Sequence, residues 1–329
     1  MGYAATIGFF DGVHIGHRYV LQSLCRLAKS HGLESMVVTF REHPRALIEP
    51  RSLVHLLTSP EERMELLTLC GVDKVEMLDF ASIKTNTAEE FMRYLHKERG
   101  VEVLLMGYDH RFGSDGLWKY ADYETAAQRI GLRLQRLPEY TENAAHVSST
   151  VCRRLLRERR VEEANRLLGY CYTLSGIVGH GKGIGRTIGF PTANLILDFP
   201  QKIIPADGVY AAEVMIEEDR ARASLADMTD SIADVTDAAA ADTKSAKTYQ
   251  ALVNIGSNPT VGGGERVIEV NLLDFAGDLY GKRLSVHLLR YLRDERTFPS
   301  LNELRRQIEA DKQALLSISK NGSTDAHKG

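Results

Sequence analysis

Two histidines near the start of the chain have the spacing for chemistry on a phosphate. His14 and His17 flank Gly16 in the segment His14-Ile15-Gly16-His17, directly after a glycine turn. At the start of a helix both imidazoles would face a bound anion, and Gly16 would let a nucleotide approach the backbone. Such donors stabilise the charge that develops during in-line attack on an α-phosphate. The segment favours nucleotidyl transfer. The alternatives are two surface histidines or a zinc pair, and zinc would need further ligands nearby.

A run of hydroxyl side chains supplies a second candidate phosphate site. Ser148, Ser149 and Thr150 precede Arg153 in the segment SSTVCR. At a helix start, hydroxyls and free backbone N–H groups can cradle a phosphate, and Arg153, one turn on, can clamp the β- and γ-phosphates. A plain helix cap is the alternative. Together with the histidine pair, the phosphate interpretation is the stronger one.

The second half contains a glycine-rich stretch followed by two candidate oxygen ligands. Residues 179–186 read GHGKGIGR, which is not a P-loop because glycine follows Lys182 where Ser or Thr is required. A flexible hairpin is the alternative. Thr192 and Asn194 lie two residues apart on an extended segment, so they point the same way and suit Mg²⁺. A turn whose side chains bond its own backbone is the other interpretation.

Glu269 is the candidate base of this half. It lies in an alternating strand pattern over residues 267–274, where it shares a face with Asn271 while Ile268 and Val270 share the other. The pattern alone fits an outward surface carboxylate equally well. The glycine-rich stretch and its oxygen ligands favour instead a base for a substrate hydroxyl.

Strands and helices alternate through the first half. Each apolar run is followed by a helical pattern, and two helices begin at capping boxes. This alternation predicts an α/β domain with a parallel sheet covered on both faces, whose ligands bind beyond the carboxyl ends of the strands. The predicted strands are Ala4–Phe9, Ser35–Phe40, Val75–Leu78, Val101–Met106 and Leu132–Leu137, and the predicted helices are Arg18–His31, one from Ser59 toward Leu69, one from Thr87 and one near Tyr123–Ile130.

The second half changes to strand runs broken by glycine and proline. A helical pattern returns only at the end, from Ser300 to about Ser317. This order predicts a small antiparallel barrel closed by a C-terminal helix. Residues 217–248 interrupt it with a low-complexity insertion that could not bury a core, and residues 319–329 are predicted to be a disordered tail. The predicted strands are Tyr172–Val178, Val209–Ile216, Gln250–Ile255, Val267–Asp274 and Leu284–Leu292.

Composition limits the classes of protein. A chain of 329 residues predicts two domains, and a net charge of −3 provides no field that would hold it on nucleic acid or an anionic membrane. The four cysteines are far apart and suggest neither a disulfide framework nor a zinc site. No apolar run approaches the roughly 20 residues that span a bilayer, and no signal peptide precedes the first strand. We expect a cytoplasmic protein with small-molecule ligands.

Four segments of the first half resemble, in order, the motifs of the FMN adenylyltransferase module of prokaryotic bifunctional FAD synthetases, a HxGH-type nucleotidyltransferase. They are GFFDGVHIGH at 8–17, FREHPR at 40–45, GYDHRFG at 107–113 and SSTVCR at 148–153. The resemblance implies that His14, His17 and Arg153 serve ATP in a Rossmann-like domain. His43, Asp109 and Phe112 would lie toward the flavin phosphate and ring. The other residues that it assigns to ATP are Gly8, Phe9, Asp11, Gly16, Ser148, Ser149 and Thr150.

Five segments of the second half resemble the riboflavin kinase module of the same family. The resemblance implies a six-stranded antiparallel barrel in which Thr192 and Asn194 serve Mg²⁺–ATP. Glu269 would be the base, and Arg293 would lie near the flavin. The segments are Gly185–Asn194, Asn254–Thr260, Glu269–Asp274, Asp278–Lys282 and Arg293–Glu295, and the residues assigned to ATP are Gly181, Gly183, Gly185 and Arg186.

The two resemblances imply one bifunctional enzyme of FAD biosynthesis. It would convert riboflavin to FMN in residues 169–318 and FMN to FAD in residues 1–168, with ATP as co-substrate and Mg²⁺ as cofactor. Two alternatives stay open: a riboflavin kinase with an inactive N-terminal module, and a flavin-binding regulator without turnover. The sequence does not predict the oligomeric state.

Overall fold

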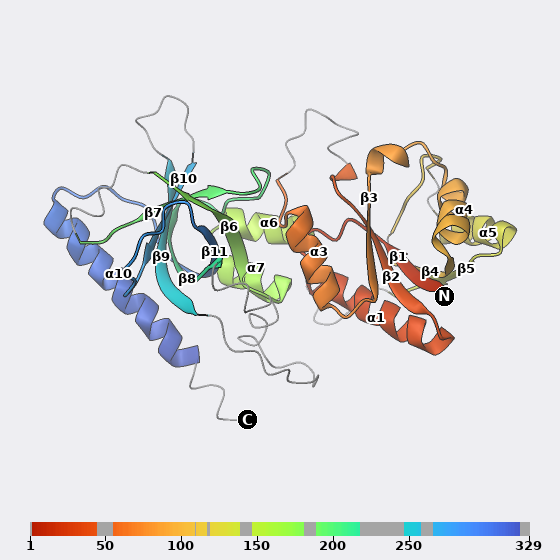
Figure 1. Cartoon of the computed structure of the whole chain (residues 1–329), viewed down its shortest axis with the longest axis horizontal. Helices are drawn as coiled ribbons and strands as arrows, with labels where there is room; N and C mark the ends of the chain where they lie inside the picture. The colour runs from red at the N-terminus through yellow and green to blue at the C-terminus, as the bar shows by residue number, and fades with distance from the viewer. Residues whose placement is uncertain are drawn as a thin grey trace. The chain divides into compact units, whose positions relative to one another are not determined.

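The computed structural model describes residues 2–44, 55–108, 110–116, 119–138, 147–180, 189–217, 247–257 and 266–322 (Figure 1). The chain divides into two compact units, residues 1–149 and 150–329. We describe each by itself. Over the described ranges, no helix combines the length and the apolar character that crossing a membrane requires.

The first unit is a parallel five-stranded sheet with the order β3-β2-β1-β4-β5. Its predicted strand–helix alternation is confirmed. The chain builds the sheet outward from β1 in two directions, first to β2 and β3 and then to β4 and β5. Because the connections between parallel strands are right-handed, α1 and α3 cover one face of the sheet, and α4 and α5 cover the other. The strands are β1 (Tyr3–Ile7), β2 (Glu34–Phe40), β3 (Lys74–Leu78), β4 (Val101–Met106) and β5 (Arg133–Arg136), and the helices are α1 (Ile15–His31), α3 (Pro60–Leu69), the short 3₁₀ helix η1 (Phe80–Ser82), α4 (Ala88–Arg99) and α5 (Tyr120–Ile130).

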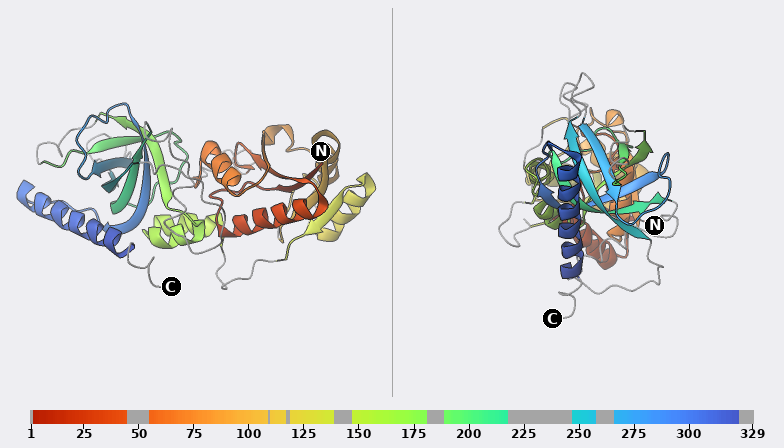
Figure 2. Two further views of the ribbon diagram at one scale, coloured as in Figure 1. Left: turned by 60° about the horizontal axis from the view of Figure 1, so that its bottom comes forward. Right: turned by 90° about the vertical axis from the view of Figure 1, so that its left-hand side faces the viewer.

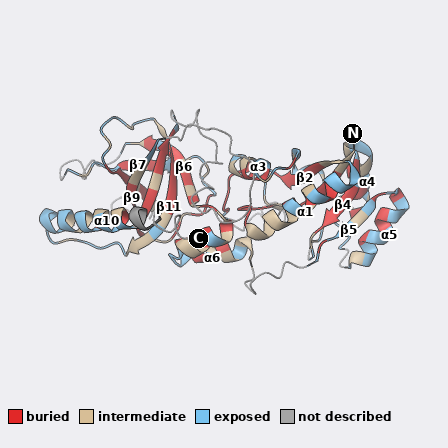
Figure 3. Ribbon diagram, turned by 90° about the horizontal axis from the view of Figure 1, so that it is seen from below, coloured by how far each residue is buried: buried red, intermediate tan, exposed pale blue. Residues whose placement is uncertain are grey.

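Part of the core of this unit lies between the sheet and helices α4 and α5, and helices α1 and α3 bury apolar side chains of their own. One cluster joins strand residues such as Ile7, Val38 and Leu104 to Phe91 of α4 and Tyr123 of α5. Figure 3 shows the strands buried while α1 and α5 keep an exposed side. The sheet is therefore buried between helices whose outer sides face solvent.

Two helices of this unit begin at the predicted capping boxes. Ser59 accepts from the Glu62 backbone N–H at 3.1 Å, and the Glu62 carboxylate accepts from the Ser59 N–H at 2.9 Å. Thr87 and Glu90 make the same reciprocal pair at the start of α4. Such caps satisfy N–H groups that the helix itself leaves without partners, so these starting points follow from local sequence.

The second unit is a closed barrel of six antiparallel strands with the order β10-β7-β6-β11-β8-β9. Its inner face is apolar: Leu174, Val253, Val270 and Val286 are each fully buried. Figure 2 shows the barrel with a long helix along its outer wall. The strands are β6 (Tyr172–Gly179), β7 (Ala193–Leu197), β8 (Gly208–Ile216), β9 (Thr248–Ser257), β10 (Arg266–Leu272) and β11 (Arg283–Arg293), and the helices are α6 (Ser149–Arg157), α7 (Val161–Leu168) and α10 (Leu301–Gly322).

Helix α10 packs against the outside of the barrel. Leu315 joins Ala211 of β8 and Leu252 of β9 in a small buried cluster. The helix runs to Gly322, so the prediction of a disordered tail from residue 319 is wrong for residues 319–322. The rest of that tail and nearly all of the 217–248 insertion lie outside the described residues.

Helices α6 and α7 belong to the barrel unit by their contacts, although the sequence interpretation placed residues up to 168 in the first domain. Asn165 of α7 donates to the Leu288 carbonyl of β11 at 2.8 Å and accepts from the Tyr172 N–H of β6 at 2.8 Å. The Leu156 carbonyl of α6 accepts from Ala206 N at 3.1 Å. These bonds join residues far apart in sequence, and local patterns do not reveal them.

Candidate functional site

The histidine pair lies where the strand order of the parallel sheet reverses. β1 pairs with both β2 and β4, and the chain leaves β1 through a tight turn into α1. Phe10 and Val13 in this turn have φ angles of 54° and 36°, which non-glycine residues rarely adopt. Backbone strain of this kind concentrates at functional sites, and ligands of doubly wound sheets bind at the point of reversal.

His14 and His17 stack on each other at the start of α1. Their ring centroids are 3.6 Å apart with an interplanar angle of 17°. His14 is the N-cap, and its Nδ1 accepts from the His17 backbone N–H at 3.3 Å. Burial, with His14 beside it, lowers the pKa of His17 well below 6.5, so His17 is neutral at pH 7. As a neutral imidazole, His17 can still donate a hydrogen bond to a phosphate oxygen.

Backbone and side-chain bonds bring the other nucleotide segments to this turn. The Asp11 carboxylate accepts from the Leu57 and Thr58 backbone N–H groups at 3.0 and 3.1 Å. Ser149 Oγ donates to the Asp11 carbonyl at 2.8 Å. A Cβ on Gly16 would stand 3.3 Å from the His14 ring and 3.9 Å from the Val147 carbonyl. Ser149 of the hydroxyl segment thus lies next to the turn that carries the histidines.

Phe9 and His43 meet at the same edge. Their rings make an edge contact, with centroids 4.6 Å apart. The guanidinium of Arg63, a residue of α3, lies 4.1 Å from the centroid of the Phe9 ring. Arg63 is a site neighbour that sequence reasoning missed. Its only signal was a charged residue in a helical pattern, which ordinarily indicates an exposed position.

The segment after β4 contributes Phe112, which is anchored from the core. The Tyr123 hydroxyl bonds both the N–H and the carbonyl of Phe112, at 2.9 and 2.8 Å. The Phe112 ring also contacts Phe91 and His110. Asp109, the third residue predicted to face the flavin, lies outside the described residues. Phe112 is thus held in the segment that follows β4. Strand β4 pairs with β1, the strand that leads into the histidine turn.

Arg153, Ser148 and Thr150 lie at or near the start of α6. Arg153 is half-buried, one turn into the helix. The division between the two units falls between Ser149 and Thr150. A role of Arg153 in binding ATP stays a prediction.

On the barrel, Glu269 stands in a lateral row of polar residues. Glu269 of β10 is in register with Asn194 of β7 on one side and with Asn254 of β9 on the other. Directly opposed residues of antiparallel strands share a face, so the three side chains project together. The neighbours Ile268 and Val270 are buried inside, which confirms the predicted alternation and places Glu269 on the outer wall.

Asn271 and Asn194 shape the segment that carries the predicted metal ligands. Asn271 Nδ2 donates to the Pro191 carbonyl at 2.7 Å, which ties the residue before Thr192 to the strand of Glu269. Thr192 is exposed beside it. Asn194 Oδ1 is buried without a hydrogen-bond partner in the described structure. Like Arg63, Asn271 is a residue near the site to which the sequence analysis assigned no role. The ATP residues Gly181, Gly183, Gly185 and Arg186 lie outside the described residues.

Arg293 is held by an ion pair at the end of β11. Its Nε and Nη2 donate to the Asp311 carboxylate of α10, with distances of 2.8 to 3.0 Å, and Asp311 is buried. Gln307 Nε2 also donates to Asp311 at 2.8 Å. The guanidinium lies 5.8 Å from the Phe298 ring centroid. This network fixes Arg293 against the loop that leads into α10.

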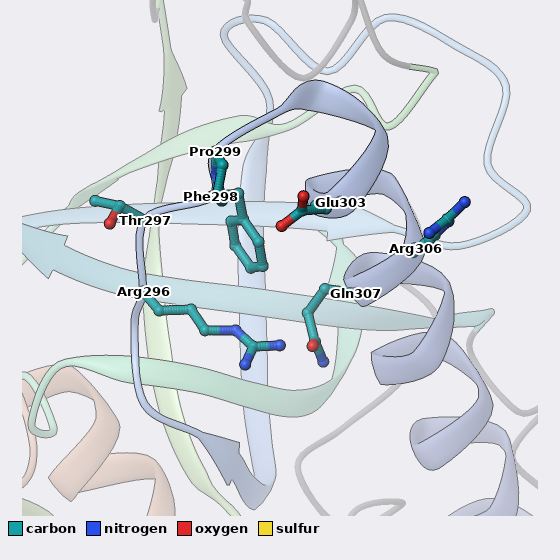
Figure 4. A pocket seen from close by; sticks show the side chains of 7 residues that line it. All are labelled: Arg296, Thr297, Phe298, Pro299, Glu303, Arg306 and Gln307. Carbon is teal, nitrogen blue, oxygen red and sulfur yellow. The ribbon is translucent and has the colours of Figure 1, made fainter.

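That loop and the first turns of α10 line an open pocket of about 330 Å³ (Figure 4). Phe298 and Gln307 point into it from opposite sides, and Arg296 reaches toward Gln307. Its walls combine an aromatic ring with charged and amide side chains. The lining residues are Arg296, Thr297, Phe298, Pro299, Glu303, Arg306 and Gln307.

Comparison with known proteins gives the two units separate families. Residues 1–151 match the FAD synthetase family, and residues 168–319 match the riboflavin kinase family. A crystal structure described as a macrolide-efflux protein from Streptococcus pneumoniae has a TM-score of 0.79 and 30% identity, covering 95% of this chain and 94% of that one. The matched fold therefore extends over both units.

Curated relatives span the chain as a whole. The bifunctional riboflavin kinase/FMN adenylyltransferase of Escherichia coli strain K12 is 35% identical over 312 residues, covering 94% of this chain and 90% of its own. The protein of the same description from Bacillus subtilis strain 168 is 30% identical, covering 96% and 92%. The chain belongs to the family of bifunctional riboflavin kinases/FMN adenylyltransferases.

Proposed function

We propose that this chain phosphorylates riboflavin to FMN on the barrel and adenylylates FMN to FAD on the parallel sheet. The observation that carries the proposal is the separation of the two sets of functional residues. The histidine pair lies in the first unit, and the Asn194–Glu269–Asn254 row lies in the second. Each set suits one of the two phosphoryl chemistries, and neither suits both.

In the kinase reaction Glu269 accepts the proton of the riboflavin 5′-hydroxyl as that oxygen attacks the γ-phosphorus of ATP. The bond between the γ-phosphorus and the bridging oxygen breaks, and ADP leaves. Asn194 and Asn254 flank the carboxylate by strand register, so the base is held on a rigid wall. Asn271 holds the Pro191–Thr192 backbone next to it.

Thr192 and Asn194 fit the requirements of Mg²⁺ in this site. A hydroxyl and an amide oxygen are hard, neutral ligands, and Asn194 Oδ1 is a buried oxygen with no hydrogen-bond partner in the described residues. When bound, Mg²⁺ would offset the negative charge of the triphosphate. The two side chains would orient the triphosphate so that its γ-phosphorus faces the hydroxyl that Glu269 deprotonates.

In the adenylyltransferase reaction the FMN phosphate attacks the α-phosphorus of ATP, and pyrophosphate leaves. The nucleophile is already an anion, so no base is needed. Catalysis consists of positioning and charge stabilisation. His14 and His17 stand at a helix start that favours anions, and Arg153 would bind the leaving phosphates.

The flavins would meet different surroundings in the two units. His43 and Phe112, with Asp109, would contact FMN at the edge of the sheet. The pocket of about 330 Å³ beside the Arg293–Asp311 pair would receive the riboflavin ring on the barrel. Because ATP is the co-substrate of both reactions, and none of the four cysteines, which all lie in the described ranges, forms a disulfide, we place the protein in the cytoplasm.

One assay tests the proposal. Purified protein is incubated with riboflavin, ATP and MgCl₂, and the flavins are separated by chromatography over time. We expect FMN to appear first and FAD to follow as FMN is consumed. FMN alone would indicate a kinase whose N-terminal unit does not turn over, and unchanged riboflavin would indicate a flavin-binding regulator.

A further inference from the structure

Arg63 is a buried cation in the first unit, and no carboxylate of the described residues is hydrogen-bonded to it. Its side chain, on α3, is fully buried. Charged residues are rarely found at fully buried positions unless they are paired. Its Nη2 donates to the carbonyls of Phe40, at 2.5 Å, and Arg41, at 3.3 Å. Its Nε and Nη1 have no partner among the described residues. Burial lowers the pKa of Arg63 to about 10, and nearby Asp11 opposes that shift, so the group is charged at neutral pH.

The guanidinium supports one segment of the site from two directions. It stacks 4.1 Å from the centroid of the Phe9 ring, and the edge of that ring meets His43. It also binds the carbonyls of Phe40 and Arg41, where β2 ends and the chain continues to His43. One planar group therefore fixes both the beginning of the His43 segment and the ring against which His43 rests.

We propose that Arg63 is a positioning residue of the adenylyltransferase site, which sets the location of His43 and thereby the binding of FMN. The inference rests on the proposed function, because it takes His43 to meet the flavin phosphate. Arg63 itself touches no substrate. A lysine or an aliphatic side chain could not replace it fully. Only the planar guanidinium can stack on an aromatic ring and, at the same time, donate hydrogen bonds to backbone carbonyls.

The ATP side of the site is held by bonds that do not involve Arg63. The Phe9 carbonyl accepts from Thr39 Oγ1 at 3.1 Å, and the Gly8 N–H donates to Val38 at 3.0 Å. Asp11 is fixed by the backbone of residues 57 and 58. Loss of Arg63 should therefore release the Phe9 ring and His43 while the turn that leads to His14 stays in place. The backbone of Phe9, a residue that the resemblance assigns to ATP, stays held by Thr39, so the effect should fall on FMN and spare ATP.

The test measures steady-state FMN adenylylation in the full chain with Arg63→Met. We expect the KM for FMN to rise about tenfold or more, the size of effect that follows when a binding group is misplaced by a fraction of an ångström. The KM for ATP should stay within about twofold, and riboflavin phosphorylation in the same molecule should be unchanged. Arg93→Met is the matched control, because Arg93 forms an exposed ion pair with Glu89 at 2.7 Å on α4.

A double-mutant cycle separates positioning from a general structural role. If Arg63 acts through His43, adding Arg63→Met to His43→Ala should raise the KM for FMN no further than His43→Ala alone. Additive effects, or an equal rise in both KM values, would overturn the inference.

Should Arg63→Met abolish the thermal transition of the first unit, the variant Phe9→Leu is tested in its place. Phe9→Leu keeps the cation and removes the ring, and an unchanged KM for FMN would then contradict the proposal. Absence of FAD formation in the parent protein would contradict the proposed function instead.

Discussion

The two sites bring side chains of different character to the flavin oxygen that each must activate or accommodate. The sheet offers imidazoles, whereas the barrel offers the carboxylate of Glu269 between two amides. The difference follows from the nucleophiles. A flavin phosphate arrives already negative and needs its charge accommodated, while a flavin hydroxyl is neutral and needs a proton acceptor. The nature of the nucleophile thus decides which side chains each unit must hold.

The sites also differ in how their residues are fixed. Glu269, Asn194 and Asn254 lie on adjacent strands, so strand register alone places them side by side. The residues of the first unit lie on turns after β1, β2 and β4, and specific bonds such as Asp11 to the backbone of residues 57 and 58 hold them. Removing a positioning group should therefore disturb the sheet site more than the barrel site.

The largest effect is expected from Glu269→Gln, which keeps the size of the side chain and removes the proton acceptor. Riboflavin phosphorylation should fall by about 10²–10⁴-fold, the usual contribution of a general base. Conversion of added FMN to FAD should stay within about twofold, because the two sites are built from the residues of separate units. Loss of both activities in a folded protein would refute the two-site account.

His17→Ala should produce the converse pattern. Loss of a donor to developing phosphate charge costs about 10²–10³-fold in rate, so FAD formation from FMN should fall by that order while riboflavin phosphorylation continues. His31→Ala, at the other end of the same helix α1, is the matched control and should leave both rates unchanged. A kinase defect in His17→Ala would show that the two units are coupled.

Thr192→Ala should have a smaller effect that added metal reverses. Removing one neutral ligand should weaken Mg²⁺ binding by about tenfold, so the rate at low Mg²⁺ falls and rising Mg²⁺ restores part of it. Glu269→Gln should show no such recovery, since its defect is the missing base. Riboflavin phosphorylation measured against Mg²⁺ at saturating ATP distinguishes them. Identical Mg²⁺ dependence in Thr192→Ala and the parent would remove Thr192 from the metal site.

The sequence predicts most elements of the fold because local signals set them. The capping boxes at Ser59 and Thr87 start α3 and α4 as expected, and the apolar runs of the first half become its five strands. Strand β7 was not identified from the residue pattern, because it is only five residues long and Ile196 within it is exposed. The resemblance to the riboflavin kinase module supplied the sixth strand.

The candidate site was predicted less completely, for a physical reason. His14, Asn194 and Glu269 carry recognisable chemistry at recognisable spacing. Arg63 and Asn271 act through contacts with residues far away in the chain, such as the Phe9 ring and the Pro191 carbonyl. Nothing in their neighbouring residues reports those contacts, because tertiary packing creates them.

The smallest effect is expected from replacing residues 217–247 by a short Asn-Gly turn. Strands β8 and β9 pair in register as far as Met215 and Thr248, so a short connection can join them. Riboflavin phosphorylation should stay within about threefold, because closing a shorter loop costs little. Complete loss of kinase activity with native-like circular dichroism would show that the insertion completes the kinase site.

The most direct test of two complete and separate sites is complementation. Glu269→Gln and His17→Ala are each incubated alone with riboflavin, ATP and MgCl₂, and then mixed in equal amounts. Alone, Glu269→Gln should leave riboflavin unchanged, and His17→Ala should accumulate FMN. The mixture should form FAD, because FMN released by one protein is adenylylated by the other. A mixture that makes no FAD, although His17→Ala releases FMN, would contradict the account.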